Sequence, residues 1–376
     1  MKIPFNKPIS IDSFSCVKDF ASRIEFYGGN GPHSRRIEVW FKEYLKMSTF
    51  LTSSCTQAME LACILFDISE GDEVIMPAFN FTSAPAVVSM FGAKPVFVDI
   101  SEQDLNIDCS KIESAISEKT KGIFAMNYAG VPCDYDKLSN IAQKNSLFIL
   151  EDNAHGLGGR LDEQPLGTFG DVSCHSFHYS KNVHCGEGGA LSIKDRNNEL
   201  RAEIVREKGT NRAQYLRGQK DKYSWHDKGG SFLLSDILSA VLDSQLASLD
   251  SITQNRLRTW HFYYESLVEW CVEHNFAVPI IKRGLLQPAH IFYLWSRNSD
   301  MSLRLIDHLR KRGVDAVQHY QSLDQSVGFQ KYGKKTGESC DVSRMVSQGI
   351  VRLPLWYDMT DEERGYVVDG VLSFKY

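Results

Sequence analysis

The sequence predicts an α/β fold, with a large domain built on a mostly parallel sheet and a smaller C-terminal α/β domain. Two observations carry this prediction. Between residues 50 and 195, short apolar strands alternate with single helices. These strands are apolar along nearly their whole length, which is typical of parallel sheets covered by helices on both faces. A second strand–helix unit begins near residue 286 and indicates the smaller domain.

The predicted strands of the large domain cover residues 73–76, 94–100, 121–127, 146–151, 173–178 and 188–193. The helices between them are predicted from apolar positions that share one face. Residues 55–66 place Met59, Cys63 and Phe66 together, and residues 110–118 and 134–145 are amphipathic. A charged helix at 196–208 follows the last strand.

A long helical stretch, rich in Leu, Trp and Tyr, is predicted at 235–275. The second unit comes after it, with a strand within 286–295 and a helix at 302–312. We therefore expect residues 1–255 to form the large domain, including the N-terminal segment, and residues 256–376 to form the small domain.

Composition excludes several classes of protein. The 42 basic and 47 acidic residues give a net charge of −5, and 43% of the residues are hydrophobic. A disordered chain and a protein that coats nucleic acid are both disfavoured, and no nucleic-acid partner is expected. No apolar run approaches the roughly 18 residues of a membrane span, so no membrane association is expected. The nine cysteines form no Cys-x-x-Cys pair, which favours free thiols in the cytoplasm over disulfides or a metal site.

Two strands of the predicted sheet deliver reactive side chains to the edge where α/β sheets bind ligands. One strand ends at Asp152, with His155 just beyond it, and the other leads to Lys181. An isolated Asp most often caps a turn, and an isolated Lys is usually solvated. Together they match the needs of pyridoxal 5′-phosphate (PLP), because a lysine holds its aldehyde as a Schiff base and an acid keeps its ring nitrogen protonated.

A phosphate site is predicted at the start of the helix at 55–66. Ser53, Ser54, Cys55 and Thr56 open this helix. Hydroxyls and free N–H groups at a helix N-terminus suit an anion. Ordinary N-capping by Ser53 or Ser54 is compatible with that role.

These motifs, taken in order, resemble those of the DegT/DnrJ/StrS sugar-nucleotide aminotransferases. The resemblance extends from Ile3 to the last helix and rests on Pro77-x-Phe79-x-Phe81-Thr82, Glu151-Asp152-x-Ala154-His155, Ser176-Phe177-x-x-x-Lys181 and Gly186-Glu187-Gly188-Gly189. Three more segments, Arg206–Arg212, Asp221–Trp225 and Arg352–Leu355, are similar to members that make dTDP-4-amino-4,6-dideoxygalactose.

The resemblance implies the fold type I architecture of PLP-dependent transferases, which is that of aspartate aminotransferase. It implies that Lys181 is the catalytic residue, binding PLP and later moving a proton, and that Asp152 pairs with the ring nitrogen. The other implied cofactor contacts are Phe81 on the ring, His155 at its phenolic edge, and Ser54, Cys55, Thr56 and Ser176 at the phosphate. Core packing is the alternative for Phe81 and His155, and a buried strand hydroxyl is the alternative for Ser176.

The family also implies a homodimer whose active sites are shared between subunits. Many members carry an Asn that reaches the phosphate of the partner subunit, and Ser231 stands at that position here. Substrate contacts are expected from the loops at 26–36, 209–231 and 318–333. The candidates are Tyr27, Gly29, Asn211, Arg212, His319 and Tyr320.

The implied reaction moves an amino group from L-glutamate to C4 of a nucleotide-linked 4-keto-6-deoxyhexose. The conversion of dTDP-4-keto-6-deoxyglucose to dTDP-4-amino-4,6-dideoxygalactose, for bacterial surface polysaccharides, fits the motifs best. Alternatives are the gluco product, a 3-amino sugar or a UDP-linked sugar. A PLP-dependent sugar dehydratase is disfavoured, because those enzymes carry His in place of Lys181. A non-catalytic sensor with the same fold is the remaining alternative.

Overall fold

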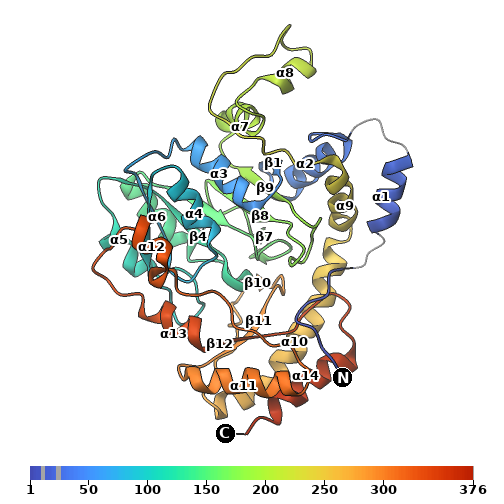
Figure 1. Ribbon diagram of the computed structural model, residues 1–376, viewed down its shortest axis with the longest axis vertical. Helices are drawn as coiled ribbons and strands as arrows, with labels where there is room; N and C mark the ends of the chain where they lie inside the picture. Colours follow the sequence, from blue (N-terminus) through green and yellow to red (C-terminus); the bar gives the residue numbers. More distant parts are fainter. Residues whose placement is uncertain (10–12, 23–26, 376) are drawn as a thin grey trace.

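The computed structural model describes residues 1–9, 13–22 and 27–375. Its centre is a seven-stranded sheet with the strand order β1-β9-β8-β5-β4-β2-β3 (Figure 1). The strands from β8 to β3 are parallel, whereas β9 runs antiparallel to both of its neighbours. The strands are β1 (Ser48–Thr52), β2 (Glu73–Pro77), β3 (Lys94–Val98), β4 (Thr120–Met126), β5 (Phe148–Asp152), β8 (Val172–Ser176) and β9 (Gly189–Ile193). The predicted α/β class with a mostly parallel sheet is confirmed.

Helices cover both faces of this sheet. One face is covered by α3 (Cys55–Leu65), α4 (Ser83–Met90) and α7 (Glu199–Arg206). The other face is covered by α2 (Pro32–Leu45), α5 (Ile112–Ala115), α6 (Tyr135–Asn145) and α9 (Asp236–Leu246). Side chains alternate between the faces as strand geometry requires. In β2, for example, Val74 and Met76 pack on the α3 side, whereas Ile75 packs on the α5 and α6 side.

The small domain has its own hydrophobic core, at the lower end of the molecule in Figure 1. Its elements are α10 (Leu249–Glu273), α11 (Ser299–Lys311), α13 (Asp341–Gly349), α14 (Asp361–Leu372) and the antiparallel pair β11 (Phe292–Trp295) and β12 (Ile350–Leu353). Ile3 is fully buried in this core. Its N–H donates to the carbonyl of Gly313 (2.8 Å), and its carbonyl accepts from the N–H of Asp315 (2.9 Å). The first residues of the chain therefore pack on the small domain.

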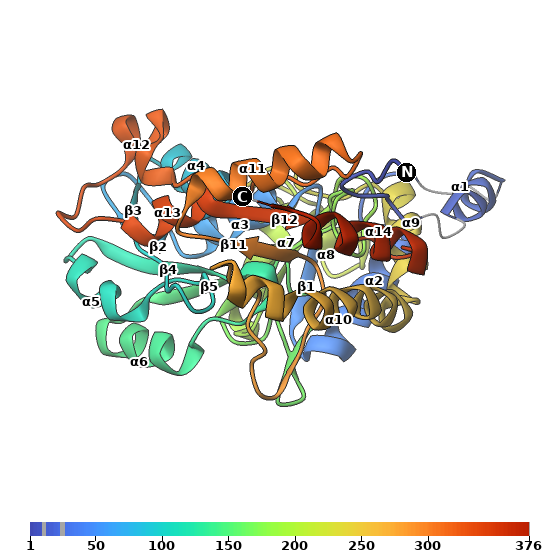
Figure 2. The ribbon, with the colours of Figure 1, turned by 90° about the horizontal axis from the view of Figure 1, so that it is seen from below.

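The remaining elements are short or lie at the periphery. They are α1 (Ser13–Ser22), α8 (Arg212–Leu216), α12 (Val327–Tyr332) and the strands β6 (Arg160–Leu161), β7 (Gln164–Pro165) and β10 (Leu285–Leu286). The loop with α8 extends away from the body of the molecule, at the top of Figure 1, and α1 stands apart at one end in Figure 2. Among the described helices, none is long and apolar enough to cross a membrane.

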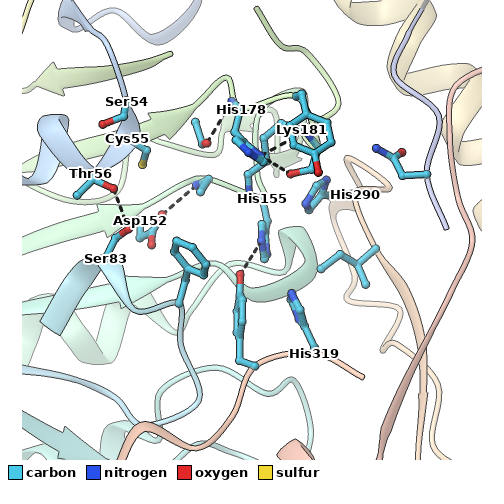
Figure 3. Close-up of a pocket in the computed structure, with 18 of the residues that line it drawn as sticks. Ser54, Cys55, Thr56, Ser83, Asp152, His155, His178, Lys181, His290 and His319 are labelled. Carbon is cyan, nitrogen blue, oxygen red and sulfur yellow. Dashed lines mark hydrogen bonds between the residues drawn. The ribbon is translucent and has the colours of Figure 1, made fainter. Parts of the chain in front are cut away.

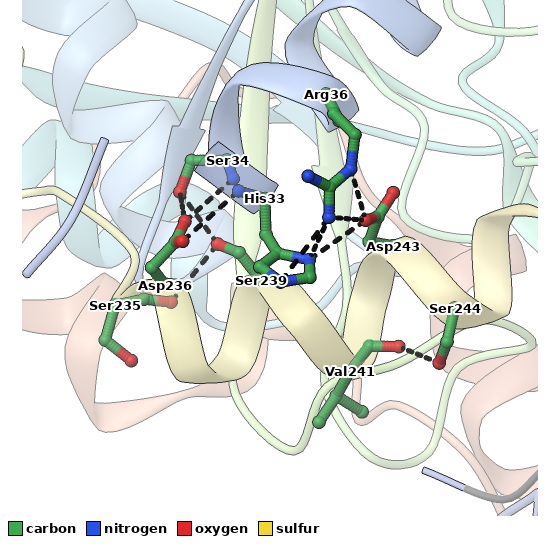
Figure 4. A network of polar contacts seen from close by, with 9 residues as sticks. All are labelled: His33, Ser34, Arg36, Ser235, Asp236, Ser239, Val241, Asp243 and Ser244. Atoms are coloured by element: carbon green, nitrogen blue, oxygen red, sulfur yellow. Dashed lines mark hydrogen bonds and ion pairs between the residues drawn. The ribbon is translucent and has the colours of Figure 1, made fainter. Parts of the chain in front are cut away.

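A polar network joins α2 to α9 (Figure 4). Asp236 is fully buried at the start of α9 and accepts hydrogen bonds from the N–H groups of His33 (3.2 Å) and Ser34 (2.8 Å) and from the Ser34 hydroxyl (2.8 Å). Asp243, two turns further along α9, pairs with Arg36 at 2.7 Å. A buried carboxylate is stable in the folded state when such donors surround it, so this network fixes where α2 begins.

The structure differs from the predicted elements in several places. The helical stretch at 235–275 is two helices, α9 and α10, which end and begin around Ala247 and Ser248. The helix predicted at 110–118 is shorter, consisting of a 3-10 turn at Cys109–Lys111 followed by α5. Strand β1 and the helices α2 and α4 had no counterpart in the prediction. The predicted domain division at 255/256 falls inside α10 and stays a prediction.

Candidate active site

A cavity of about 520 Å³ opens beyond the carboxyl ends of the parallel strands (Figure 3). Residues of the large domain form most of its wall, and residues of the small domain close the rest. Figure 3 shows Ser54, Cys55, Thr56 and Ser83 on one side of the pocket. Lys181 lies on the opposite side. The cavity is therefore at the sheet edge where the sequence predicted a ligand site.

Ten of the predicted site residues line this cavity. They are Ser54, Cys55, Thr56, Phe81, Asp152, His155, Ser176, Lys181, His319 and Tyr320. The sequence separates these residues by up to 266 positions, from Ser54 to Tyr320, and the fold brings them together.

Five predicted site residues lie outside the cavity lining. Tyr27 is exposed, and Gly29 forms a β-bridge with Ser235. Asn211 is buried, and its side-chain oxygen accepts a hydrogen bond from the N–H of Ser224 (2.8 Å).

Of the other two residues, Arg212 forms an ion pair with Glu207 (2.5 Å). Ser231 is exposed and forms a β-bridge with Glu207. Within this chain, Asn211 and Arg212 stabilise their own loop through these contacts.

Ser54, Cys55, Thr56 and Ser83 form a cup of hydroxyl and N–H groups at the N-terminus of α3, which we call the phosphate cup. Ser54 caps the helix by accepting from the N–H of Gln57 (3.1 Å). The Thr56 and Ser83 hydroxyls contact each other at 2.8 Å and line the cavity. The first N–H groups of a helix have no partner within it, and the helix dipole favours negative charge there. This cup suits a phosphate group.

Gly189 lets the chain pass close behind this cup. A Cβ atom at position 189 would overlap the backbone nitrogen of Cys55 and the backbone carbon of Ser54. Only glycine therefore allows β9 to run against the start of α3 at this point.

Asp152 ends β5 and points to the cavity from the α3 side of the sheet. Its carboxylate accepts one hydrogen bond, from the N–H of Ala154 (3.1 Å), and no other from the residues the structure describes. Burial raises its pKa, whereas the Ala154 hydrogen bond and the charge of Lys181 lower it. An incompletely satisfied buried carboxylate is ready to pair with a cationic or N–H group of a ligand.

Lys181 lies in the turn after β8, and its N–H donates to the carbonyl of His178 (2.9 Å). Its amine makes no hydrogen bond or ion pair within the described part of the chain. Burial lowers the pKa of Lys181 to about 8, while Asp152 and Cys55 act in the opposite direction and Arg352 adds to the lowering. A substantial fraction of this amine is therefore neutral near physiological pH, which a nucleophile or base requires.

Aromatic and imidazole rings form the floor of the cavity. His155 contacts the Tyr320 hydroxyl at 3.2 Å, and His319 contacts the Tyr128 hydroxyl at 2.7 Å. The Nδ1 atom of His155 accepts from the N–H of Ala129 (3.3 Å), so its Nε2 atom carries the proton that is donated to Tyr320. Burial, together with the nearby cations, lowers the pKa of His155 and of His319 well below the ordinary value. Both rings are neutral at neutral pH.

The structure adds cavity residues that the sequence did not single out for this site. Phe5 and Asn6 come from the N-terminal segment, Arg256 from α10, His290 from the segment before β11 and Arg352 from β12. The Arg352–Leu355 motif carried part of the family resemblance, but no local pattern showed that Arg352 faces the cavity.

The side chain of Asn182 connects the turn that contains Lys181 to the small domain. It donates to the carbonyl of Pro288 (2.7 Å) and accepts from Nδ1 of His290 (2.9 Å).

The charges around the cavity favour an anionic ligand. Lys181, Arg256 and Arg352 line it together with only one buried acid, Asp152. The other acid of the lining, Glu187, is exposed. A site with more buried cations than acids is stabilised by negatively charged ligands.

These parts fit PLP. The hydroxyls and N–H groups at the start of α3 suit its phosphate. Asp152 has an unused acceptor for its ring nitrogen, and Lys181 has an unengaged amine for its aldehyde. Phe81, which is 54% exposed to the cavity and the solvent, offers an aromatic face. The cavity therefore offers a partner for each of the three groups of PLP, which are its phosphate, its ring and its aldehyde.

Comparison with known proteins agrees with this assignment. The model of the DegT/DnrJ/EryC1/StrS aminotransferase family matches residues 21–372. The protein MJ1066 of Methanocaldococcus jannaschii is 28% identical over 350 residues, which are 91% of this chain and 89% of that protein.

Two of the solved structures are similar to the chain in both fold and sequence. DesV of S. venezuelae, in complex with a ketimine intermediate, has a TM-score of 0.87 at 26% identity, covering 98% of this chain and 97% of that one. Spr1654 of Streptococcus pneumoniae, described as a sugar aminotransferase and solved in its PLP form, has a TM-score of 0.89 at 25% identity, covering 99% and 98%. The predicted fold type I is confirmed, and the chain belongs to the DegT/DnrJ/EryC1/StrS aminotransferase family, whose members depend on PLP.

Proposed function

We propose that this protein moves the amino group of L-glutamate to the C4 keto carbon of a nucleotide-linked 4-keto-6-deoxyhexose. The sequence motifs favour dTDP-4-keto-6-deoxyglucose as acceptor and dTDP-4-amino-4,6-dideoxygalactose as product, in the synthesis of a bacterial surface polysaccharide. We place this reaction in the cytoplasm. The observation that carries the proposal is the unengaged Lys181 amine, with its pKa lowered to about 8, in the same cavity as the incompletely bonded Asp152 carboxylate.

When bound, PLP supplies an electron sink for the negative charge left as a proton leaves the carbon that carries the amino group. The residues of the chain anchor the cofactor and move the protons. Asp152 holds a proton on the ring nitrogen, and the phosphate cup at the start of α3 anchors the phosphate group of PLP. Lys181 takes the proton from the donor carbon and later delivers one to C4 of the sugar, and the face from which it does so sets the configuration at C4. The neutral His155 can donate its Nε2 proton without adding charge beside Lys181.

A homodimer with shared active sites is part of the proposal. The loop that carries Asn211, Arg212 and Ser231 projects from the body of the molecule (Figure 1). It exposes large apolar groups, among them Trp225, which is 79% exposed. Contact with a second copy would cover these groups and bring the loop to the partner's cavity. The substrate contacts of Tyr27, Gly29, Asn211 and Arg212, and the contact of Ser231 to the phosphate in the partner subunit, stay predictions.

The test mixes the PLP-loaded protein with L-glutamate and dTDP-4-keto-6-deoxyglucose and identifies the sugar nucleotide by mass spectrometry and NMR. We expect a 4-amino product that is lost in Lys181→Ala, with an axial C4 amine for the galacto configuration. An equatorial amine would correct the product to the gluco sugar. A deoxygenated sugar without nitrogen would favour the dehydratase.

Covalent attachment of PLP to Lys181, measured as a mass increase after borohydride reduction, separates the other outcomes. Attachment and conversion by glutamate without a sugar product would leave the aminotransferase and reject this acceptor. Attachment without reaction with any amino donor would favour the sensor.

A further inference from the structure

The imidazole ring of His290 is held in one tautomer by Asn182. The side-chain NH₂ group of Asn182 donates to the carbonyl of Pro288 (2.7 Å), so its oxygen faces Nδ1 of His290 (2.9 Å) and accepts from it. The reversed amide would bring two oxygen atoms together at Pro288. Nδ1 of His290 therefore carries the proton, and Nε2 is an acceptor only.

This acceptor has no partner within the protein. Nε2 of His290 makes no hydrogen bond with residues 1–9, 13–22 or 27–375. The side chain is 7% exposed and lines the cavity, on the Lys181 side of the pocket in Figure 3, with its ring centroid 4.5 Å from that of His155. Burial, with the nearby His155 and Lys181, lowers the pKa of His290 well below the ordinary value, so the ring stays neutral. A buried acceptor without a partner is a candidate ligand contact.

The backbone around His290 is also held in place. Ala289 has a φ of 52°, in the left-handed region that residues with a Cβ atom rarely adopt. Arg256 donates through Nε to the carbonyl of Ala289 and through Nη2 to the carbonyl of His290, both at 2.9 Å. The chain thus keeps an unfavourable conformation that presents His290 to the cavity, and such conformations cluster at functional sites.

The chemistry of the ligands decides which group donates to Nε2 of His290. The phosphate and phenolic oxygens of PLP are acceptors, and its ring N–H belongs to Asp152. The carboxylates of the amino donor are acceptors as well, and its amine is the group that reacts. A nucleotide-linked sugar carries hydroxyl groups, which donate. An acceptor-only ring in this cavity therefore matches a sugar hydroxyl.

The position of His290 indicates which hydroxyl it meets. Asn182 directly follows Lys181, so its hydrogen bond places His290 beside the turn that carries the proton-moving lysine. In a 4-keto-6-deoxyhexose, the reacting C4 lies between C3, which carries a hydroxyl, and C5, which carries a methyl group. The hydroxyl next to the reacting carbon is therefore that of C3.

Resting on the proposed function, we propose that Nε2 of His290 accepts a hydrogen bond from the C3 hydroxyl of the keto-sugar, and that Asn182 is a positioning residue that fixes the tautomer for it. His290 thus selects acceptors with a hydroxyl beside the ketone. The amino donor has no such hydroxyl, so its reaction does not depend on this contact.

The test compares dTDP-4-keto-6-deoxyglucose with its 3-deoxy analogue in the half-reaction of the aminated enzyme, followed by the absorbance of the cofactor. The wild type should prefer the hydroxylated sugar by about 10- to 100-fold, the usual penalty for a buried acceptor left unpaired. His290→Phe keeps a planar ring without the acceptor and should reduce this preference to less than about threefold. His290→Gln keeps an acceptor oxygen and should retain part of the preference.

The preference is a ratio measured within one variant, so general damage to the site cancels from it. Asn182→Ala frees the imidazole ring to change tautomer and should weaken the preference although His290 is present. The half-reaction with L-glutamate should change by less than about threefold in His290→Phe. His261→Phe, on the exposed face of α10, is the matched control and should keep the wild-type preference.

Binding gives a readout that does not depend on turnover. The probes are dTDP-6-deoxyglucose and its 3-deoxy analogue, which have no ketone to react. By calorimetry on the PLP-loaded protein, we expect the wild type to bind the hydroxylated probe more tightly and His290→Phe to bind the two probes equally.

If the wild type reacts with L-glutamate but aminates neither keto-sugar, the proposed function fails in its acceptor, and the inference fails with it. If the wild type aminates both sugars equally well, the proposed function stands and the inference fails. A preference that persists in His290→Phe, with the glutamate half-reaction slowed instead, would assign the acceptor to Lys181 and also overturn the inference.

Discussion

Glu151 and Asp152 are neighbours on β5, yet their carboxylates serve opposite sides of the sheet. Glu151 is fully buried and accepts four hydrogen bonds, from the side chain of Asn127 (2.7 Å) and from the N–H groups of Gly167 (2.6 Å), Phe169 (2.8 Å) and Gly170 (3.2 Å). Asp152 accepts one, from Ala154, and faces the cavity. One carboxylate thus fixes the loop that leads into β8, and the other is left for a ligand.

This contrast predicts opposite effects of two isosteric substitutions. Glu151→Gln replaces an acceptor oxygen by an NH₂ group that faces N–H donors, which should lower the free energy of unfolding by about 1–3 kcal/mol for each group left unsatisfied. Asp152→Asn should leave the apo-protein as stable as the wild type or more so, because it removes a buried charge, yet slow the glutamate half-reaction by about 100-fold or more. Urea unfolding and single-turnover absorbance measure the two effects. Equal loss of stability in both variants would contradict this division of roles.

The close approach of Gly189 to the start of α3 predicts that a side chain at position 189 weakens the binding of PLP. Gly189→Ala forces a methyl group against the first residues of α3 and should displace the phosphate cup. Overpacking of this kind costs about 1–3 kcal/mol, which corresponds to a loss of PLP affinity of roughly 5- to 150-fold if the whole cost falls on the bound state. Titration of the apo-protein with PLP, followed by absorbance, measures it.

Gly365→Ala is the control for this substitution, because it lies within α14 with open space around it. It should bind PLP normally and be slightly more stable, by about 0.5–1 kcal/mol. Normal PLP affinity in Gly189→Ala would show that the start of α3 does not hold the phosphate.

The lowered pKa of Lys181 predicts how fast the apo-protein captures PLP at different pH values. Only the neutral amine attacks the aldehyde, so the rate should rise as the pH increases through about 8, rather than through the ordinary 10.5. Asp152→Asn removes a neighbour that raises this pKa and should move the midpoint to lower pH, whereas Arg352→Gln should move it to higher pH. Stopped-flow absorbance measures the rate, and borohydride reduction with mass spectrometry identifies the lysine.

The same titration on free Nα-acetyl-lysine, in the same buffers, accounts for the ionisation of PLP itself. A protein midpoint that coincides with that of the free amino acid would contradict the effect of burial.

The central part of the site was predictable because parallel strands end at a common edge. Once β5 and β8 are recognised from their apolar runs, Asp152 and Lys181 must approach each other, and the Ser54–Thr56 segment follows from the start of α3. The strand pattern also brought His155 to this edge, and the family motifs gave it a role beside the cofactor. The family motifs alone added Phe81 and the His319–Tyr320 pair, which no local pattern would have placed there.

The rest depended on contacts between distant segments. β1 is a strand because it pairs with β9, and Thr49 there contacts Ser192 through their hydroxyls (2.8 Å), a partner 143 residues away. The break between α9 and α10 has no Gly or Pro to mark it. Leu249 and Ile252 at the start of α10 still pack in the cluster that contains α2, and the helix enters the core of the small domain only from Leu257 onward. Arg352 and Phe5 meet from opposite ends of the sequence, so neither could be assigned to the cavity from its own neighbourhood.

The position of Ile3 has a consequence for how the protein is made. A ribosome releases the N-terminus first, and the strands that carry Asp152 and Lys181 can assemble while synthesis continues. The segment with Ile3 and Phe5 has no surface to dock on until Gly313, Asp315 and then Arg352 have emerged. A nascent chain therefore holds the lysine and the phosphate cup before it has the wall that contains Arg352, and the cavity closes only when the segment with Ile3 and Phe5 docks on residues synthesised some 300 positions later.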